Sequence, residues 1–142
     1  VIFKVNSPGG AVSTFGLAAA QLARLRGVAG ISTTVCIDKI AASGGYMIAS
    51  QANKLVAAPF AYVGSIGVIV ETLNFHDILK SYGVTPLVLK AGEAKNPLTT
   101  FGPITKKEIS VEQERMTKVH ELFTEYTIQG RPVLEGKEGE VC

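Results

Sequence analysis

The sequence predicts an α/β fold with a mostly parallel sheet. Short apolar or β-branched runs alternate with longer helix-like runs, and glycine-containing turns join them. The chain has 142 residues, of which 46% are hydrophobic, so it is long enough for a core of its own. We therefore expect one domain of this class.

The first part of the chain predicts two successive strand, turn and helix units. Residues 1–5, VIFKV, fit a buried strand, and the breaker NSPGG separates them from the alanine-rich, helical stretch 11–26. Residues 31–37, ISTTVCI, are β-branched and predict the next strand. Ser43 follows, immediately before the helix-like residues 44–53, GGYMIASQAN.

The second part continues the alternation with three short strands and a helix. In chain order these are a strand over Lys54–Ala58, a strand over Gly67–Val70, a helix over Thr72–Gly83 and a strand over Val84–Lys90. Pro86 places the last strand at an edge or a bend, because proline has no N–H for a sheet ladder.

A long helix follows a loop rich in glycine and proline. Thr105 and Glu108 have the spacing of a capping box, and the helix that they announce runs to about Gln129. The ending RPVLEGKEGEVC is charged, glycine-rich and without periodicity. We therefore expect the domain to occupy residues 1–130 and residues 131–142 to form a disordered or truncated tail.

Composition argues against several classes of function. The net charge is +2 and the basic residues are scattered, which gives no bias toward nucleic acid or anionic lipid. Cys36 and Cys142 have no CxxC or metal-ligand spacing, and no residue cluster implies a metal, nucleotide or organic cofactor. The longest apolar run, residues 63–70, is shorter than the ~20 residues of a membrane span. The chain opens on a strand-like run without a targeting leader, as expected of a piece of a longer protein.

The turn ASGGY makes Ser43 a candidate nucleophile. A serine hydroxyl attacks a carbonyl only when a base takes its proton and a pair of donors receives the oxyanion. At a strand-to-helix turn the N–H of Gly44 would serve as one donor, and the helix N-terminus would favour the developing negative charge. Taken alone, however, the motif is more typical of a plain turn.

The turn NSPGG is a candidate for the second oxyanion donor. Pro8 has no N–H of its own, and Gly9 and Gly10 can adopt conformations that leave their N–H groups unpaired. An ordinary loop explains the motif equally well. Two glycine turns that each follow a strand of one α/β domain would nevertheless lie at the same edge of the sheet, where such folds build their sites.

Whether Ser43 is a nucleophile or a turn residue depends on whether the chain supplies a general base. His76 and His120 each lie in an amphipathic helical stretch, where a solvated or packed histidine is the simpler interpretation. A lysine can serve instead if burial or nearby positive charge lowers its pKa from ~10.4 toward ~7–8. Lys95, in KAGEAKNPL, has mostly small or apolar neighbours and is one of several candidate lysines. Glu93 would keep that amine protonated unless it points away.

Taken together, these motifs resemble the SohB branch of the signal-peptide-peptidase-A family of serine proteases. NSPGG, GLAAAQLARLR, ASGGYMIA, VGSIGV and KAGEAKNPL follow one another in the family's order and spacing, from Asn6 to about Gln129. The resemblance implies a Clp-protease/crotonase-like fold of repeated ββα units. It also implies a serine endopeptidase with a Ser/Lys dyad, no cofactor, and membrane-derived or unfolded peptides as substrates, including signal peptides.

The resemblance assigns roles to individual residues. Ser43 matches the nucleophile, and Lys95 matches the general base. Ser65, in VGSIGV, matches a serine that hydrogen-bonds the lysine amine and orients it. The oxyanion donors implied by the family are the backbone N–H groups of Gly10 and Gly44, and no metal is implied.

The resemblance also implies partners and a location. The family carries an N-terminal membrane anchor with an earlier strand-helix unit, and a further strand and helix after the matched region. These residues show neither the anchor with its earlier unit nor the later strand and helix. We therefore expect a domain incomplete at both ends, from a membrane-associated protein. The family forms homo-oligomeric rings, in which serine and lysine can come from adjacent subunits. The fragment alone can therefore be inactive.

Two other functions remain open at this point. A Clp-type proteolytic subunit shares the fold and the SPGG turn, but its base is a histidine about 25 residues after the serine, where this chain has Val68. A non-catalytic or acyl-CoA-binding relative would use similar glycine turns to polarise a thioester carbonyl, and it would need neither Ser43 nor Lys95.

Overall fold

The computed structural model describes residues 1–92 and 95–137 and divides into two compact units. The first unit contains residues 1–67 and the chain from His120 onward, and the second contains residues 68–119. Each unit is described separately below.

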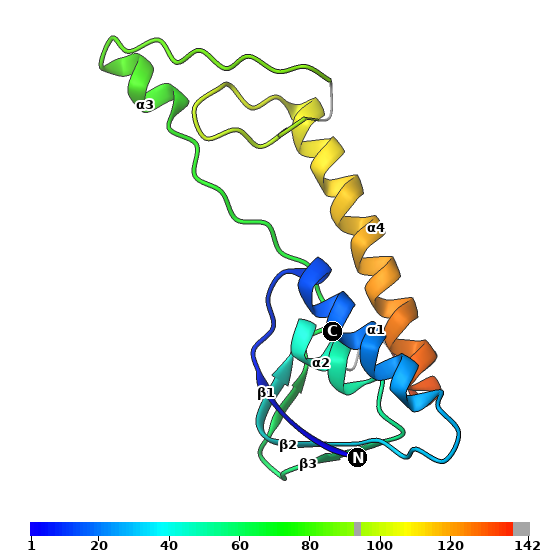
Figure 1. Ribbon diagram of the computed structural model, residues 1–142. Helices are drawn as coiled ribbons and strands as arrows, with labels where there is room; N and C mark the ends of the chain where they lie inside the picture. Colours follow the sequence, from blue (N-terminus) through cyan, green and yellow to red (C-terminus); the bar gives the residue numbers. More distant parts are fainter. Residues whose placement is uncertain (93–94, 138–142) are drawn as a thin grey trace. The chain divides into compact units, whose positions relative to one another are not determined.

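A four-stranded, fully parallel sheet forms the centre of the first unit (Figure 1). Its strands are β1 (Ile2–Ser7), β2 (Thr34–Ala42), β3 (Lys54–Ala57) and β4 (Tyr62–Gly64). The central strand β2 pairs with β1 on one side. On its other side β2 pairs first with β3 and then, nearer its carboxyl end, with β4. This confirms the predicted α/β class with a parallel sheet.

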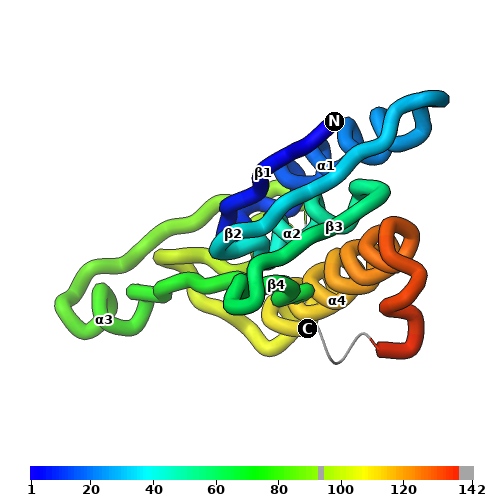
Figure 2. The backbone as a smooth tube through the Cα atoms, turned by 90° about the horizontal axis from the view of Figure 1, so that it is seen from below, coloured from blue at the N-terminus to red at the C-terminus, as the bar shows by residue number. Residues whose placement is uncertain are grey.

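Helices α1 (Val12–Arg26) and α2 (Gly44–Ala49) pack against each other, and α2 also contacts β1 and β2 (Figure 2). The buried core joins strand, helix and loop side chains, among them Val35, Ile37, Leu22, Met47 and Phe123. Ala19 and Ala41 are fully buried within it. Their small side chains let the helices approach the sheet closely, as the dense packing of protein interiors requires.

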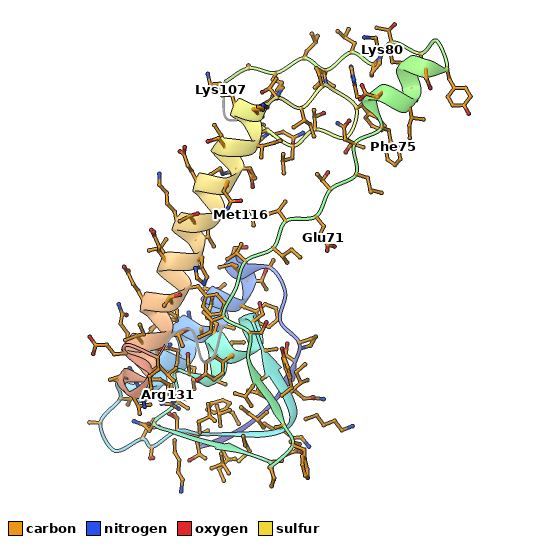
Figure 3. All side chains as sticks on the ribbon, turned by 180° about the vertical axis from the view of Figure 1, so that it is seen from behind. Glu71, Phe75, Lys80, Lys107, Met116 and Arg131 are labelled. Carbon is orange, nitrogen blue, oxygen red and sulfur yellow. The ribbon has the colours of Figure 1, made fainter. Side chains whose placement is uncertain are left out.

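The last turns of α4 (Lys106–Gly130) and the short helix η1 (Pro132–Leu134) complete the first unit. Gly130 lies so close to the turn after α2 that an added Cβ would approach the Ser50 carbonyl oxygen to 2.4 Å. The Arg131 guanidinium, labelled in Figure 3, donates to the Ala52 carbonyl at 2.7 Å. Leu134 packs against the core, so part of the expected tail region 131–142 contributes to this unit.

The second unit contains α3 (His76–Ser81), the first turns of α4 and the loops that connect them. The capping box predicted at the start of α4 is confirmed. The Thr105 N–H donates to Glu108 Oε2 at 2.8 Å, and the Glu108 N–H donates back to Thr105 Oγ1 at 3.2 Å. Reciprocal bonds of this kind satisfy N–H groups that a helix start leaves unpaired.

Two of the predicted strands are wrong. Residues 67–70 and 84–90 form no sheet ladder in the described chain, whereas the short strand β4 was not predicted. The run 84–90 has the composition of a strand, but Leu87 and Leu89 are 81% and 85% exposed. Composition gives a segment its β propensity, but a strand also needs a neighbour with free backbone groups.

The remaining element bounds differ mainly at their ends. β2 starts later than predicted and continues to Ala42, because β1 and β4 supply pairing partners beside its carboxyl half. The helix expected over 44–53 ends at Ala49, and the one expected over 72–83 is confined to His76–Ser81. Asn74 instead donates its side-chain amide to the carbonyls of Thr99 and Gly102, at 2.7 and 2.9 Å.

Candidate active site

Three turns gather at the carboxyl edge of the parallel sheet. The chain leaves β1 within NSPGG, leaves β2 at Ser43 and leaves β4 at the bend around Ser65. The register pairs Ser7 with Ala41 and Ala42 with Gly64, so the three strands end side by side. The sequence-based expectation that the two glycine turns share one sheet edge is confirmed. Parallel α/β folds commonly place ligand sites there.

Ser43 has an unusual backbone conformation for a residue with a side chain. Its φ is 51° and its ψ is −124°, in a region that residues other than glycine rarely occupy. Its N–H donates to the Gly64 carbonyl at 2.9 Å, and its carbonyl accepts the first helical bond from the Met47 N–H at 2.9 Å. These two bonds hold the strained turn in place.

The hydroxyl of Ser43 is not used for helix capping. Serine at an N-cap position ordinarily accepts a hydrogen bond from the N–H of the second or third helical residue. The Ser43 side chain makes no such bond at α2, within the described chain. Because Ser43 is also only half-buried, its hydroxyl is available to a ligand.

Direct contact between the two glycine turns explains why one of them needs glycine. An added Cβ on Gly9 would lie 2.6 Å from the Cβ of Ser43 and 3.0 Å from the backbone nitrogen of Gly44. Gly9 also has a φ of 105°, which side chains disfavour. Its N–H donates to Ser7 Oγ at 3.2 Å, so Gly9 itself is a poorer oxyanion donor than Gly10.

Gly10 and Gly44 both lie against the aromatic side chain of Phe15. An added Cβ would lie 2.7 Å from Phe15 Cε2 at Gly10 and 2.5 Å from Phe15 Cγ at Gly44. Neither backbone N–H has an acceptor among residues 1–92 and 95–137. Unpaired backbone amides are the kind of donor that stabilises an oxyanion. Sequence reasoning missed Phe15, because its place in α1 gives no sign of this contact.

Ser65 follows directly on β4, where the backbone takes an unusual conformation; residues 64–66 are called the bend below. Gly64 and Ser65 have consecutive positive φ values of 115° and 54°. Ser65 is exposed, while the neighbouring Ile66 is buried. The imidazole Nε2 of His120 lies 3.2 Å from the Ile66 carbonyl oxygen. His120 was expected to be an ordinary helical histidine, and nothing in its sequence neighbourhood reveals this contact 54 residues away.

Lys95 belongs to the second unit, whereas the other four predicted site residues belong to the first. It is exposed, and its backbone N–H donates to the Gly92 carbonyl at 3.2 Å. It lines a surface pocket of about 480 Å³ in that unit. The other lining residues are Val70, Glu71, Thr72, Asn96, Pro97, Leu98, Glu112 and Arg115. The objection raised by Glu93 falls on a residue outside the described ranges.

Within the described ranges, no helix is both long and apolar enough to cross a membrane.

Comparison with known proteins identifies relatives along most of the chain. The model of Peptidase family S49 matches residues 27–137. The chain is 45% identical to "Probable protease SohB" of Haemophilus influenzae over 135 residues, which are 95% of this chain and 38% of that protein. It is 42% identical to "Probable protease SohB" of Buchnera aphidicola subsp. Schlechtendalia chinensis, with 94% and 44% coverage. It is 31% identical to "Putative signal peptide peptidase SppA" of Enterococcus faecium, with 92% and 38% coverage.

These matches confirm the resemblance to the SohB and SppA proteases, and the chain spans less than half the length of each of these three relatives. The family match includes Ser43, Ser65 and Lys95, and it is consistent with the Clp-protease-like fold that the motifs implied. Together with the parallel sheet and the turns at its carboxyl edge, it shows that the chain belongs to peptidase family S49.

Proposed function

We propose that this chain carries the catalytic core of a serine endopeptidase with Ser43 as nucleophile and Lys95 as general base. The observation that carries the proposal is the turn at Ser43. Its hydroxyl caps no helix in the described chain, and its turn contacts the glycine turn at Gly9, next to the unpaired amide of Gly10. Membership of a peptidase family supports the same chemistry.

The proposed reaction proceeds in two halves. Neutral Lys95 takes the proton of the Ser43 hydroxyl while the serine oxygen attacks the peptide carbonyl carbon, and the Gly10 and Gly44 amides bind the oxyanion. The C–N bond then breaks, and the lysine ammonium gives its proton to the leaving amine. Water next loses a proton to Lys95 and attacks the acyl ester, which releases the acid and returns the proton to Ser43. Ser65 would orient the lysine amine.

The proposal requires Lys95 to act in a more enclosed setting than its own unit provides. An amine accepts a proton only in its neutral form, which burial or nearby positive charge favours. We propose that assembly of a homo-oligomeric ring, in the membrane-associated full-length protein, encloses the amine beside Ser43. The lysine would come from the same chain or from an adjacent subunit. The substrates would be membrane-derived or unfolded peptides, and the name of the Enterococcus faecium relative points to signal peptides.

A fluorophosphonate probe, which reacts with activated serines, tests the dyad in the full-length protein. Labelling should be lost in Ser43→Ala and in Lys95→Ala, because removing either the nucleophile or the base abolishes activation. Ser13→Ala and Lys80→Ala are matched controls on helices α1 and α3, and both should label like the wild type. An assembled wild-type protein that does not label at Ser43 would favour the acyl-CoA-binding alternative instead.

Mixing two inactive variants tests the origin of the lysine. If Lys95 reaches Ser43 of an adjacent subunit, rings assembled from Ser43→Ala and Lys95→Ala subunits regain part of the labelling, because some interfaces contain both wild-type residues. If the dyad lies within one chain, every mixed ring stays unlabelled.

A further inference from the structure

The bend at Ser65 is strained and is held from two sides. Two consecutive positive φ values, one of them at a residue other than glycine, persist only where the surroundings enforce them. On one side the Gly64 carbonyl accepts the Ser43 N–H at 2.9 Å. On the other side the Ile66 carbonyl oxygen lies 3.2 Å from His120 Nε2. The bend is therefore tied both to the candidate nucleophile and to α4.

The contact with Ile66 fixes which imidazole nitrogen carries a proton. A carbonyl oxygen only accepts hydrogen bonds, so Nε2 must be the donor. The neutral ring is then the Nε2–H tautomer, and the charged ring keeps the same N–H. His120 cannot use Nε2 as a base while it makes this bond.

The side chains around the hydrogen bond between His120 and Ile66 are buried, which favours a rigid connection between α4 and the bend. The Ile66 side chain is 2% exposed and belongs to the core cluster. Phe123, one turn of α4 beyond His120, is 2% exposed and lies in the same cluster. The helix and the bend thus each contribute a buried side chain to one cluster, and the imidazole bond adds a directional contact between the two segments.

We propose that His120 is a positioning residue for the reaction of Ser43. It holds the Ile66 carbonyl, and through it the bend that carries the Ser65 hydroxyl and accepts the Ser43 N–H. This inference rests on the proposed function for its effect on rate, whereas the hydrogen bond itself is independent of that function.

Three substitutions separate the donor from the bulk of the ring. In His120→Gln the side-chain amide nitrogen can take the place of Nε2, whereas in His120→Asn the amide nitrogen corresponds to Nδ1 and falls short of Ile66. His120→Leu keeps volume without a donor. We expect fluorophosphonate labelling of the full-length protein to be about three- to tenfold slower in the Asn and Leu variants, the rate equivalent of one neutral hydrogen bond. The Gln variant should label within about twofold of the wild type.

His76→Gln and His76→Asn are the matched controls. His76 lies in the second unit, and its ring nitrogen Nδ1 contacts Asp77 at 2.9 Å. Both control variants should label at the wild-type rate. Equal labelling of His120→Asn and wild type would overturn the inference, and so would a Gln variant as slow as the Asn variant.

The tautomer provides a readout that does not depend on catalysis. Histidine-selective ¹⁵N labelling of the full-length protein, with the His120 signal assigned by its loss in His120→Gln, should show a proton on Nε2. A neutral ring protonated on Nδ1 would overturn the inference, even if the wild type labels at Ser43. An Nε2–H signal in a wild type that does not label would instead sustain the hydrogen bond and reject the proposed function.

Discussion

Gly9→Ala is the substitution for which the structure gives the most specific expectation. The new Cβ would lie 2.6 Å from the Ser43 Cβ and 2.9 Å from the Ala42 carbonyl oxygen. Since neither neighbour is the end of a flexible side chain, one of the two turns must move. Alanine at a φ of 105° is also strained. The substitution therefore alters the place where the candidate nucleophile is held.

The expected loss in the free energy of unfolding has two separate contributions. An L-residue in a left-handed conformation costs roughly 1–2 kcal/mol, and overpacking adds roughly 1–3 kcal/mol. We expect the free energy of unfolding to fall by about 2–5 kcal/mol. A displacement of about 1 Å between reacting groups lowers a rate on the order of a hundredfold, so labelling of Ser43 should fall by about that factor.

Gly30→Ala is the matched control for the backbone strain. Gly30 has a φ of 79°, but an added Cβ there meets no atom within 4 Å. This variant should lose only the roughly 1–2 kcal/mol of conformational strain and should label at the wild-type rate. Thermal unfolding and probe labelling are measured on both variants of the full-length protein. If Gly9→Ala labels as fast as Gly30→Ala, the contact between the two turns does not position Ser43.

The remaining predictions concern α4. Phe123 is 2% exposed in the core, so Phe123→Ala should lower the free energy of unfolding by about 3–5 kcal/mol, whereas Leu122→Ala, at a side chain that is 65% exposed, should change it by less than about 1 kcal/mol. Similar losses in the two variants would contradict the described packing of α4. The ion pair with Lys90, and hydrogen bonds from Thr105, lower the pKa of Glu108 from 4.5 to about 2. The ionised carboxylate therefore stabilises the helix start fully above pH 4.5, and this contribution is lost as the pH falls toward 2. Circular dichroism between pH 7 and pH 2 should show this loss of helix stability in the wild type. The part of the loss that Glu108 causes should be absent from Glu108→Gln. An unchanged acid profile in the variant would show that Glu108 does not stabilise the helix start.

Local patterns predicted most of the elements and the turns that carry the candidate site. The capping box at Thr105 was predictable because its two residues are three positions apart and recognise each other within one helical turn. The turn at Ser43 was predictable for a similar reason, since a small residue followed by two glycines favours a tight strand-to-helix connection. The predicted proximity of the NSPGG and Ser43 turns followed from the rule that parallel strands share a carboxyl edge.

Strand pairing could not be predicted from composition. The run 84–90 is as apolar and β-branched as many strands, yet it has no ladder partner in the described chain, while the short strand β4 forms because β2 offers free backbone groups beside Ala42. A hydrogen-bonded ladder depends on a second segment, and its identity is not contained in the first.

By itself the sequence determined the alternation of strands and helices over residues 1–57, the glycine turns and the residues that resemble a Ser/Lys peptidase, because each of these depends on neighbours a few positions away. Only the tertiary structure decided that Gly9 touches Ser43, that Phe15 packs against Gly44, and that His120 reaches Ile66. Each of these contacts joins two residues that lie far apart in the chain. They arise from the close packing of a particular core, and no local propensity specifies them.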